Sequence, residues 1–374
     1  MLLPGDPVPS FHARSPGNAS YSFDSVAGRY VVVTVIGGAT LPGVGEYLRA
    51  LYEDRRFFDD RFASLFIVSN DAGDEAAGRL TDRYPGIRIF WDEDRALIRR
   101  FGCLQNDGVT AQRVSLTTWI LDPGLRVLRL LPITDLATHH EVLFAALAEL
   151  TPPCDDFASW APVLQVPNVL EPDFCRELIA YSAREGMEDS GYMKTDPATG
   201  QTIAVVDHQH KRRSDCSIED EGLRARLQSR VQRRLIPQIE RAFQFRATRM
   251  ERYIVSCYEA QTSGHFRAHK DNTTLGTAHR RFAVSIGLNA EAYEGGDLRF
   301  PEYGMRTYRP QTGGAIVFSC SLLHEALPVT RGRRYVVLPF LYDEAAAQLR
   351  LENARHLQDP ELRQSVIESV TVRG

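Results

Sequence analysis

The segment "ERYIVSCYEAQTSGHFRAHKDNTTLGTAHRRFAVSIGLN" (residues 251–289) decides the fold of the C-terminal half of the chain. It begins and ends with short runs rich in β-branched and aromatic residues, and Gly and polar residues separate these runs. The same pattern continues through "GDLRF", "GAIVFSC" and "RYVVLPFLY". A series of short strands with turn signals between them predicts a β-sandwich or jelly roll.

Two helical segments precede these strands, at about 171–185 and 220–244. In the second, apolar residues recur every four positions, which is typical of a helix that packs one face on a core. Pro237 is predicted to kink or interrupt this helix, because proline has no backbone N–H. Before both helices lies the polar, proline-bearing stretch "TPPCDDFASWAP" (151–162), which we interpret as a domain boundary.

The first 150 residues alternate between strand-like and helix-like segments. "RYVVVTVIGG" (29–38) and "SLFIVSN" (64–70) are typical of strands buried in a parallel sheet, and an amphipathic helical segment lies between them. "TTWILDPGLRVLRLL" predicts a hairpin that turns at Asp122-Pro123-Gly124, and "HHEVLFAALAEL" predicts a final helix. This half is therefore expected to form a small α/β sandwich.

Bulk composition narrows the class of protein. A chain of 374 residues exceeds what one core usually supports, so two domains are expected. The formal net charge of −4 gives no reason to expect a nucleic acid or membrane partner. The sequence has neither a signal-peptide pattern nor an apolar run long enough to span a bilayer. Its six scattered cysteines form no disulfide framework, so we expect a cytoplasmic protein.

Residues His269 and Asp271 raise the question of a metal site. An H-x-D pair alone occurs often by chance, and an exposed strand pair is the alternative interpretation. The interpretation as a metal site is strengthened by His324, which follows another strand-like run. Two imidazoles and one carboxylate are the ligands of non-haem Fe(II) oxygenases, which leave metal positions open for a co-substrate and O₂. A structural zinc site would need a fourth protein ligand, and no cysteine has suitable spacing.

Arg334 enters a strand ten residues after His324. A co-substrate with a distal carboxylate needs a fixed cation, and the planar guanidinium of arginine can bind a carboxylate with two parallel hydrogen bonds. The alternative is that Arg334 is one more solvated arginine of "RGRR", as Arg331 and Arg333 are expected to be.

Residues 163–343 resemble the prolyl 4-hydroxylase-like branch of the 2-oxoglutarate/Fe(II)-dependent dioxygenases. The resemblance lies in "VLQVPNVLEPDFCRELI", in the pattern from Tyr258 to Asp271, and in "EGGDLRFPEYG", "GGAIVF" and "HEALPVTRGR", all in the family's order. It implies an α+β domain with a double-stranded β-helix (jelly-roll) core.

Carried over by position, the resemblance implies that His269, Asp271 and His324 bind Fe(II) and that Arg334 binds the distal carboxylate of 2-oxoglutarate. Tyr258 matches a tyrosine that often contacts the same co-substrate, although a core tyrosine is the alternative. Thr330 is a further candidate for that carboxylate, with a turn-stabilising hydroxyl as the alternative. The implied co-substrates are 2-oxoglutarate and O₂, and ascorbate is a candidate reductant.

One position departs from the family pattern. Gly287 stands where the family often has a tyrosine, and its small size is expected to widen the co-substrate pocket or leave room for a different substrate. The retained carboxylate of Asp271 favours hydroxylation over halogenation, because related halogenases replace this ligand.

The polar stretch between the two helical segments contains "DHQHKRRSD" (207–215), which resembles a substrate-side loop of the family. We therefore predict that Arg213, and with less support Arg212, contacts an acidic group of the substrate. His208 and His210 form an H-x-H pair that we interpret as incidental histidines of a solvated loop. His265 is expected to be exposed or to lie behind the ligands.

The N-terminal half resembles the peroxiredoxin/alkyl hydroperoxide reductase branch of the thioredoxin fold. The resemblance lies in "LPGDPVPSF", "VVVTVIGGATLPGVGEYLRAL", "WDEDRALIRRFGC" and "TTWILDPGLRVL". That family presents a thiolate at a helix start, where the helix dipole lowers the thiol pKa. Here Val44 and Gly45 occupy the places a cysteine could take, and Cys103 is expected to be buried. We predict an α/β thioredoxin-like domain that is redox-inactive.

Together these patterns predict a thioredoxin/peroxiredoxin-like domain at 1–150, a linker at 151–162, a dioxygenase domain at 163–345 and a helical tail at 346–374. The expected function is hydroxylation of an amino acid that is free, peptide-bound or carrier-tethered, a proline-like residue included, with release of succinate and CO₂. The expected partner is thus a small-molecule or peptide substrate, and a homodimer through the N-terminal domain is a further expectation. The alternatives are a non-catalytic binding module with a vestigial oxygenase domain and, with less support, a thiol-dependent antioxidant protein.

Overall fold

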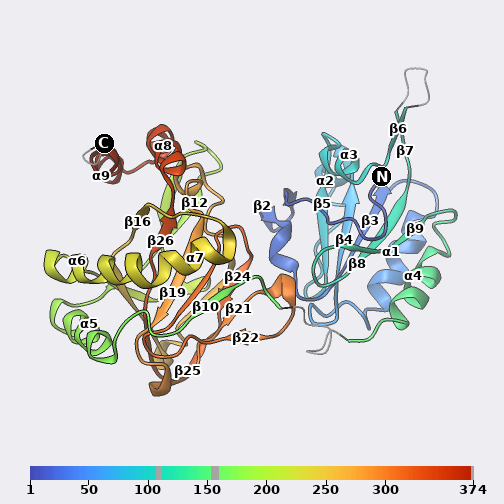
Figure 1. Cartoon of the computed structure of the whole chain (residues 1–374). Coiled ribbons are helices and arrows are strands. Elements are labelled where there is room, and N and C mark those ends of the chain that lie inside the picture. Colours follow the sequence, from blue (N-terminus) through green and yellow to red (C-terminus); the bar gives the residue numbers. More distant parts are fainter. Residues whose placement is uncertain (107–111, 153–159, 372–374) are drawn as a thin grey trace. The chain divides into compact units, whose positions relative to one another are not determined.

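The computed structural model describes residues 1–106, 112–152 and 160–371, and the chain divides into two compact units (Figure 1). One unit comprises Met1–Ser159 with the short segment Pro301–Met305, and the other comprises Trp160–Phe300 and Arg306–Gly374. Residues 153–159 of the predicted linker, Cys154 among them, and the last three residues of the predicted tail lie outside the described residues. In the described part of the chain, no helix has both the length and the apolar character to cross a membrane.

The N-terminal unit is built on a twisted mixed sheet. Its strand order is β2 (Asn18–Ser22), β1 (His12–Ser15), β5 (Ile87–Trp91), β4 (Ala63–Ser69), β3 (Tyr30–Gly37), β8 (Thr117–Leu121) and β9 (Val127–Pro132). Strands β3, β4 and β5 run parallel, whereas β8 and β9 form the antiparallel hairpin predicted at Asp122-Pro123-Gly124. The predicted thioredoxin-like α/β fold is confirmed.

Residues of β4 alternate between the two faces of this sheet. Leu65 and Ile67 pack on the side of helices α1 (Val44–Glu53) and α4 (His139–Ala148). Phe66 points to the other side, where its ring stacks on Phe90 at 4.7 Å between centroids. The shorter elements are η1 (Phe23–Val26), α2 (Ala72–Ala76), α3 (Ala96–Phe101), β6 (Leu104–Asn106) and β7 (Gln112–Val114).

Helix α1 begins at the position where the family resemblance places a reactive thiol. Val44 is the first helical residue and is 0% exposed, and Gly43 before it has a φ of 81°. Cys103 is also fully buried, and burial raises the pKa of its thiol to about 12. The N-terminal unit therefore buries an apolar side chain where the family pattern expects a thiolate.

The helices of the C-terminal unit are α5 (Pro172–Glu185), α6 (Glu221–Arg230) and α7 (Ile236–Phe243), followed near the C-terminus by α8 (Glu344–Asn353), η8 (Ala354–His356) and α9 (Pro360–Thr371). The predicted interruption at Pro237 takes the form of a π-helical turn, η3 (Val231–Leu235), between α6 and α7. A π turn accommodates the missing backbone donor of proline without ending the helix.

Two antiparallel sheets form the predicted jelly roll. The larger has the order β10 (Leu164–Val166), β23 (Ala315–Ser319), β19 (Phe282–Gly287), β25 (Val329–Val337), β17 (Ile254–Glu259), β15 (Ser214–Ser217) and β11 (Glu188–Asp189). The smaller has the order β14 (Lys211–Arg212), β18 (His265–His269), β24 (His324–Ala326), β21 (Leu298–Arg299) and β22 (Thr307–Tyr308). Other short elements are the hairpin of β12 (Tyr192–Thr195) and β13 (Thr202–Val205), together with β16 (Arg249–Glu251), β20 (Tyr293–Gly295), β26 (Phe340–Tyr342), η4 (Ala260–Thr262), η5 (Leu275–Thr277), η6 (Ala290–Ala292) and η7 (Pro301–Tyr303).

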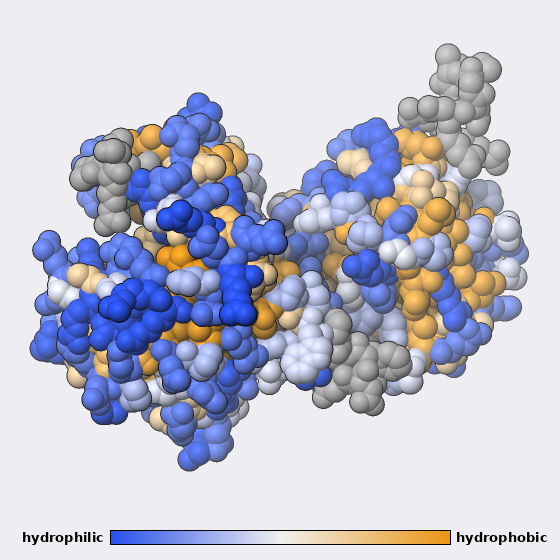
Figure 2. Space-filling view, in the orientation of Figure 1, coloured by the Kyte–Doolittle hydropathy of each residue, from blue (hydrophilic) through white to orange (hydrophobic). Residues whose placement is uncertain are grey.

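The main core of this unit lies between the larger sheet and helices α5, α6 and α7. Leu178 of α5 and Leu227 of α6 belong to the same buried cluster as Val284 and Val337 of the sheet. The outer surface over α5 and α6 is hydrophilic, in keeping with ion pairs such as Arg226–Glu177 (Figure 2). The helices thus cover one face of the larger sheet and leave its other face free to form a site with the smaller sheet.

Candidate iron and 2-oxoglutarate site

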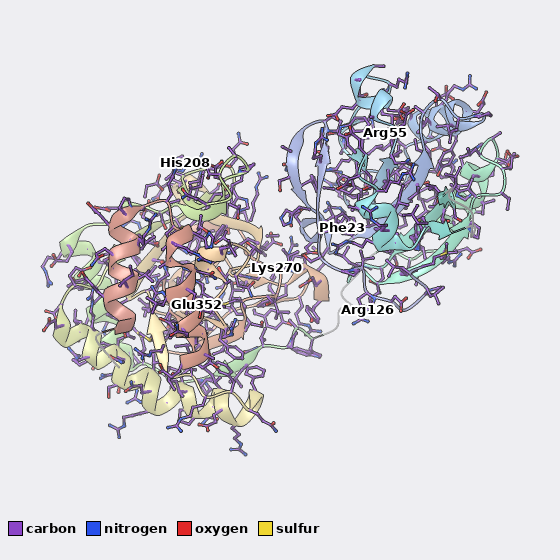
Figure 3. The ribbon with its side chains drawn as sticks, turned by 90° about the horizontal axis from the view of Figure 1, so that it is seen from above. Phe23, Arg55, Arg126, His208, Lys270 and Glu352 are labelled. Carbon is purple, nitrogen blue, oxygen red and sulfur yellow. The ribbon has the colours of Figure 1, made fainter. Side chains whose placement is uncertain are left out.

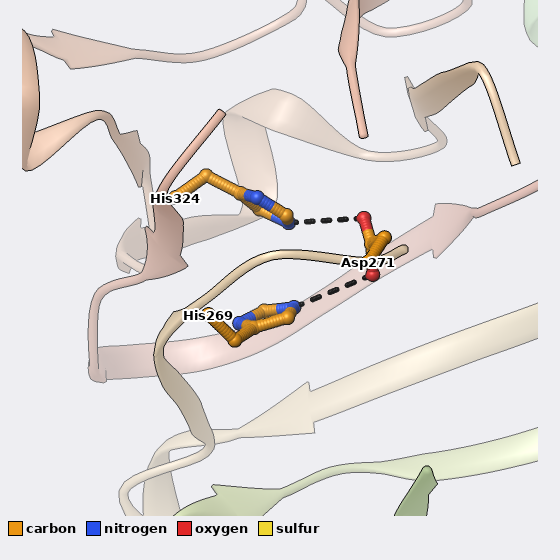
Figure 4. A group of neighbouring side chains, drawn as sticks. All are labelled: His269, Asp271 and His324. Atoms are coloured by element: carbon orange, nitrogen blue, oxygen red, sulfur yellow. Dashed lines mark ion pairs between the residues drawn. The ribbon is translucent and has the colours of Figure 1, made fainter. Parts of the chain in front are cut away.

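The three predicted metal ligands converge at one point (Figure 4). His269 ends β18 and lies directly opposite His324 of the neighbouring strand β24. A nitrogen of each histidine and an oxygen of Asp271 all lie within 4.8 Å of one another. The carboxylate lies between the imidazoles, with Oδ1 at 3.6 Å from His269 Nε2 and Oδ2 at 3.3 Å from His324 Nε2.

Asp271 reaches this point in a different way from the one suggested by the H-x-D spacing. Strand β18 ends at His269, so the carboxylate does not share a strand face with it. The backbone N–H of Asp271 donates to the carbonyl of Cys320 at 3.0 Å, and Asn272 Nδ2 donates to Ser321 Oγ at 2.8 Å. These bonds tie the turn after β18 to the segment that leads into β24, and so fix all three ligands relative to one another.

Hydrogen bonds to backbone carbonyls orient both imidazole rings. His269 Nδ1 lies 2.7 Å from the carbonyl oxygen of Arg267, and His324 Nδ1 lies 3.0 Å from that of Leu322. Because a carbonyl oxygen only accepts, each Nδ1 must carry the proton. Each Nε2 therefore presents a lone pair toward the common point, as a metal-binding histidine requires.

Burial sets the charge of these side chains. Desolvation, reinforced by neighbouring His324, lowers the pKa of His269 to about 4, so the imidazole is neutral near pH 7. Burial alone would raise the pKa of Asp271, but His324 and His269 hold it below its ordinary value. A neutral imidazole at His269 and an ionised carboxylate at Asp271 are the protonation states in which these two groups bind a divalent metal.

A cavity opens beside these three side chains. Three arginines line it: Arg213, Arg252 and Arg334. The other lining residues come from both sheets and are mostly aromatic or apolar: Tyr258, Phe266, Ala283, Val284, Ser285, Leu298, Phe318, Ala326, Leu338 and Phe340. The space among them amounts to about 490 Å³, the part open to solvent included. Its mostly apolar and aromatic lining with a few convergent charged side chains is typical of small-molecule sites.

Arg334 lies at the wall of this cavity and is 2% exposed. Its Nη2 donates to Ser285 Oγ at 3.2 Å, and its guanidinium carbon lies 4.9 Å from the ring centroid of Tyr258, its neighbour across strands β25 and β17. Its Nη1 has no hydrogen-bond partner among the described residues. A buried guanidinium with a free N–H is suited to receive a carboxylate, because an unpaired buried donor is costly.

The other predicted co-substrate residues differ in position. Tyr258 is buried and lines the cavity beside Arg334. Thr330, in contrast, is exposed and lies outside the cavity lining. Gly332 separates the two on β25 with a φ of 75°, a left-handed backbone that breaks the regular alternation of the strand. The sequence spacing therefore does not place Thr330 beside Arg334.

The expectation that Gly287 widens the pocket is wrong. A side chain at this position would meet the backbone oxygens of Pro310 and Gln311 at 3.1 and 3.2 Å from its Cβ. The segment before β23 therefore packs directly against Gly287, which is not among the residues that line the cavity.

The two neighbouring arginines of the substrate-side segment point in different directions. The Arg213 side chain is 3% exposed, lines the cavity and donates from Nη2 to Asp215 Oδ2 at 2.6 Å. Arg212 is exposed, and its guanidinium donates to the carbonyls of His208 and Thr262 at 3.2 and 3.4 Å. Only Arg213 is placed to touch a bound molecule.

The histidines interpreted as incidental are also separated by the structure. The His208 side chain is 53% exposed, pairs with Asp189 at 3.2 Å and lies at the periphery of its unit (Figure 3). His210 is half-buried and packs against Tyr192 and Phe266, so it does not belong to a solvated loop. His265 lies on β18 with Nδ1 2.8 Å from the carbonyl oxygen of Ser263. None of these three histidines belongs to the metal-binding group found among the described residues.

Sequence reasoning missed two charged residues at the cavity. Arg252 lines it and lies in the turn between β16 and β17 with a φ of 66°. Asp215 holds Arg213 and Arg252 together, with Nη2–Oδ2 distances of 2.6 and 3.3 Å. The R-x-D spacing from Arg213, just before β15, to Asp215 on it was a usable signal for Asp215. Nothing adjacent to Arg252 distinguishes it from a surface arginine.

Each half of the chain matches the model of a known protein family. Residues 253–342 match the model of the 2OG-Fe(II) oxygenase superfamily, and residues 4–128 match that of the AhpC/TSA family. Each match covers part of one half of the chain, and both resemblances drawn from the sequence are confirmed.

Curated relatives match part of the chain. A multifunctional procollagen lysine hydroxylase and glycosyltransferase of Rattus norvegicus is 28% identical over 197 residues, which is 50% of this chain and 24% of the relative. A PKHD-type hydroxylase of a Synechococcus strain is 28% identical over 126 residues, which is 32% of this chain and 50% of the relative. The chain thus spans half or less of the length of these relatives.

Solved structures resemble each half separately. A prolyl-4-hydroxylase of Pseudomonas putida has a TM-score of 0.37 and 19% identity, covering 48% of this chain and 92% of that one. The peroxidoxin BcpB of Mycobacterium tuberculosis has a TM-score of 0.34 and 18% identity, covering 40% of this chain and 99% of that one.

Proposed function

We propose that this protein is an Fe(II)/2-oxoglutarate-dependent dioxygenase that hydroxylates an amino acid and releases succinate and CO₂. The observation that carries the proposal is the presence, in one cavity, of a three-residue metal-binding group and a buried arginine with a free N–H. A metal held by three protein ligands keeps further coordination positions open, which an oxygenase needs and a structural site does not. The match of residues 253–342 to the oxygenase model supports the same reaction class.

The residues present fit ferrous iron and 2-oxoglutarate. His269, Asp271 and His324 supply the nitrogen and oxygen donors of an iron site, through Nε2 of each imidazole and the carboxylate. Arg334 would hold the distal carboxylate of 2-oxoglutarate with its free Nη1, and Tyr258 would form the adjoining wall. Bound iron would supply the reactivity toward O₂ that no side chain here possesses.

The rest of the chain's contribution is orientation and exclusion of water. Phe266 stacks on His269 with 3.5 Å between ring centroids, and Phe318 packs edge-on against His324 at 4.6 Å. These apolar contacts hold each ligand ring in place and keep its outer face dry, and a dry site protects reactive species from side reactions. Arg213, which lines the same cavity, would face the substrate, and Arg212 would not. Ascorbate remains a candidate reductant.

The N-terminal unit would have no peroxidase activity by the usual route, because Val44 and Gly45 occupy the places that a reactive cysteine could take. Its proposed role is that of a scaffold, for example for dimerisation or for presenting a partner.

Succinate release from 2-oxoglutarate, measured in air with added Fe(II), tests the proposal. We expect slow turnover without substrate that requires Fe(II) and is abolished in Asp271→Ala, because loss of the carboxylate removes one of three ligands and leaves two buried imidazoles. His208→Ala is the matched control, since this exposed histidine lies outside the metal-binding group. If the wild-type chain neither binds 2-oxoglutarate nor releases succinate with Fe(II), the alternative of a non-catalytic binding module is favoured.

A further inference from the structure

The cavity contains more positive charge than iron and 2-oxoglutarate account for. Three arginines line it, and the proposed co-substrate site uses only Arg334. Arg213 and Arg252 approach from the β14–β15 junction and from the turn before β17, and the single carboxylate of Asp215 bridges them. Ser256 Oγ donates to the other oxygen of Asp215 at 2.6 Å, so this carboxylate is already engaged on both oxygens.

Both of these arginines have donors to spare. Nε of Arg213 is buried and has no hydrogen-bond partner among the described residues, which is also true of Nη1 of Arg334. The Arg252 side chain is 29% exposed, so part of its guanidinium faces the open part of the cavity. A buried N–H without an acceptor is costly, so an acceptor that arrives with a ligand is favoured at Arg213.

The ionisation of neighbouring groups indicates the same excess of positive charge. Burial, and then Arg213, lowers the pKa of the Lys211 amine to about 6. Burial, and then Arg213, also lowers the pKa of Arg252 to about 10. Arg213 and Arg252 thus repel each other across the carboxylate of Asp215, and an added anion would relieve this repulsion.

Tyr258 separates this cationic pair from the co-substrate arginine. Its ring centroid lies 4.9 Å from the guanidinium carbon of Arg334 and 5.9 Å from that of Arg213. Two anionic groups can therefore be bound in one cavity, one near each guanidinium, without competing for the same donors. Guanidinium groups prefer carboxylates because of their matching planar geometry.

We propose that Arg213 and Arg252 form a second carboxylate subsite that binds the substrate, and that the substrate is therefore a small carboxylic acid such as a free amino acid. This inference rests on the proposed function and narrows it. A residue inside a peptide chain, or one tethered through its carboxyl group to a carrier, presents a neutral carbonyl instead. It would leave Arg213 Nε and the Arg252 guanidinium without an anionic partner.

Binding to the full chain loaded with Mn(II) and 2-oxoglutarate tests the subsite, because Mn(II) holds the co-substrate without turnover. The probes are neutral and basic L-amino acids, each as the free acid and as its C-terminal amide, titrated by calorimetry. We expect at least one free acid to bind about 100-fold or more tightly than its amide, since sites built to pair a polar group reject analogues that lack it. An amide that binds as tightly as its acid, or a complete absence of binding by the acids, would overturn the proposal.

Two variants assign the effect to the residues. Arg252→Met removes a partly exposed guanidinium, and Arg213→Lys keeps the charge beside Asp215 but removes the Nε donor. Each should bring the affinity for the free acid toward that of the amide while 2-oxoglutarate binding stays unchanged. Equal losses for acid and amide would contradict a carboxylate subsite. If the wild-type chain does not bind 2-oxoglutarate, the proposed function itself is rejected. Failure of the carboxylate subsite and failure of the proposed function are therefore distinguishable.

Discussion

In the N-terminal unit, Thr34 Oγ1 lies 3.2 Å from the hydroxyl of Tyr47 and 2.8 Å from that of Thr118, and Thr118 in turn meets His139 Nε2 at 2.9 Å. In the cavity of the C-terminal unit, buried nitrogens of Arg334 and Arg213 have no partner among the described residues. Both regions bury polar side chains, but only the first satisfies them internally. A closed hydrogen-bond network stabilises a fold, whereas unpaired buried donors destabilise it unless a ligand completes them.

This difference agrees with what each unit has kept of its family pattern. At the start of α1, an apolar side chain fills the place of the thiol. At the end of β18, in the turn after it and at the start of β24, the chain keeps the three predicted metal ligands, and backbone carbonyls orient both imidazoles. A fold can thus be retained without the side chain that carries the chemistry of its family pattern.

Arg213→Ala is expected to have the largest effect on stability. The substitution removes the ion pair between Arg213 and the mostly buried carboxylate of Asp215. Breaking a buried ion pair costs roughly 3–5 kcal/mol of the free energy of unfolding. Arg212→Ala is the matched neighbour, and as an exposed substitution it should change the free energy of unfolding by less than about 0.5 kcal/mol. Urea unfolding of both variants, followed by circular dichroism, measures the difference. Equal losses would mean that the burial of Arg213 has no energetic weight.

Arg334→Met should raise the dissociation constant for 2-oxoglutarate by about 100-fold, because charge-assisted hydrogen bonds contribute about 1.5–3 kcal/mol each. Stability should be unchanged or slightly higher, since the change removes an unpaired buried donor, and Fe(II) binding should be retained. Arg331→Met is the control, as this arginine is exposed and pairs with Glu294 on the surface. Calorimetric titration with 2-oxoglutarate distinguishes the variants. Loss of iron binding in Arg334→Met would show that its role is misassigned.

Acid should weaken the metal-free C-terminal unit through His269. Its pKa in the folded chain is lowered from 6.5 to about 4, so between these values the unfolded chain binds a proton that the folded chain does not. The free energy of unfolding should therefore fall as the pH drops from about 6.5 to about 4. His269→Gln should reduce this pH dependence. A wild-type chain and variant with the same pH profile would exclude His269 as a source of acid sensitivity.

Tyr47→Phe probes the contrasting network of the N-terminal unit. It removes one hydroxyl from the closed network and should lower the stability of this unit by about 1 kcal/mol, the usual net value of a hydrogen bond. Binding of iron and 2-oxoglutarate should not change. The fluorescence of Trp91 and Trp119, both buried in this unit, reports its unfolding. A weaker affinity for 2-oxoglutarate in Tyr47→Phe would mean that the two units are energetically coupled.

Sequence reasoning predicted the features that depend on local pattern. Strand periodicity gave both fold types, and the family pattern gave His269, Asp271 and His324, which the structure brings together. It could not predict how Asp271 is positioned, because its backbone bond to Cys320 joins residues about fifty positions apart. Arg252 was missed for the same reason, because only tertiary packing places its side chain at the wall of the cavity. Gly287 was misjudged because the Pro310 segment that fills its space is likewise remote in sequence.

Val44→Cys should have the smallest effect and sharpens the comparison most directly. It restores the thiol that the family pattern places at the start of α1, with a change in volume small enough to cost less than about 1.5 kcal/mol. Because Val44 is 0% exposed, peroxide has no access to a sulfur atom at this position, and burial opposes formation of the thiolate. We therefore expect no hydrogen peroxide reduction above the wild-type rate, measured by loss of free thiol under peroxide. Rapid oxidation of the new cysteine would show instead that a single substitution silenced this unit and that the rest of a peroxidase site is still in place.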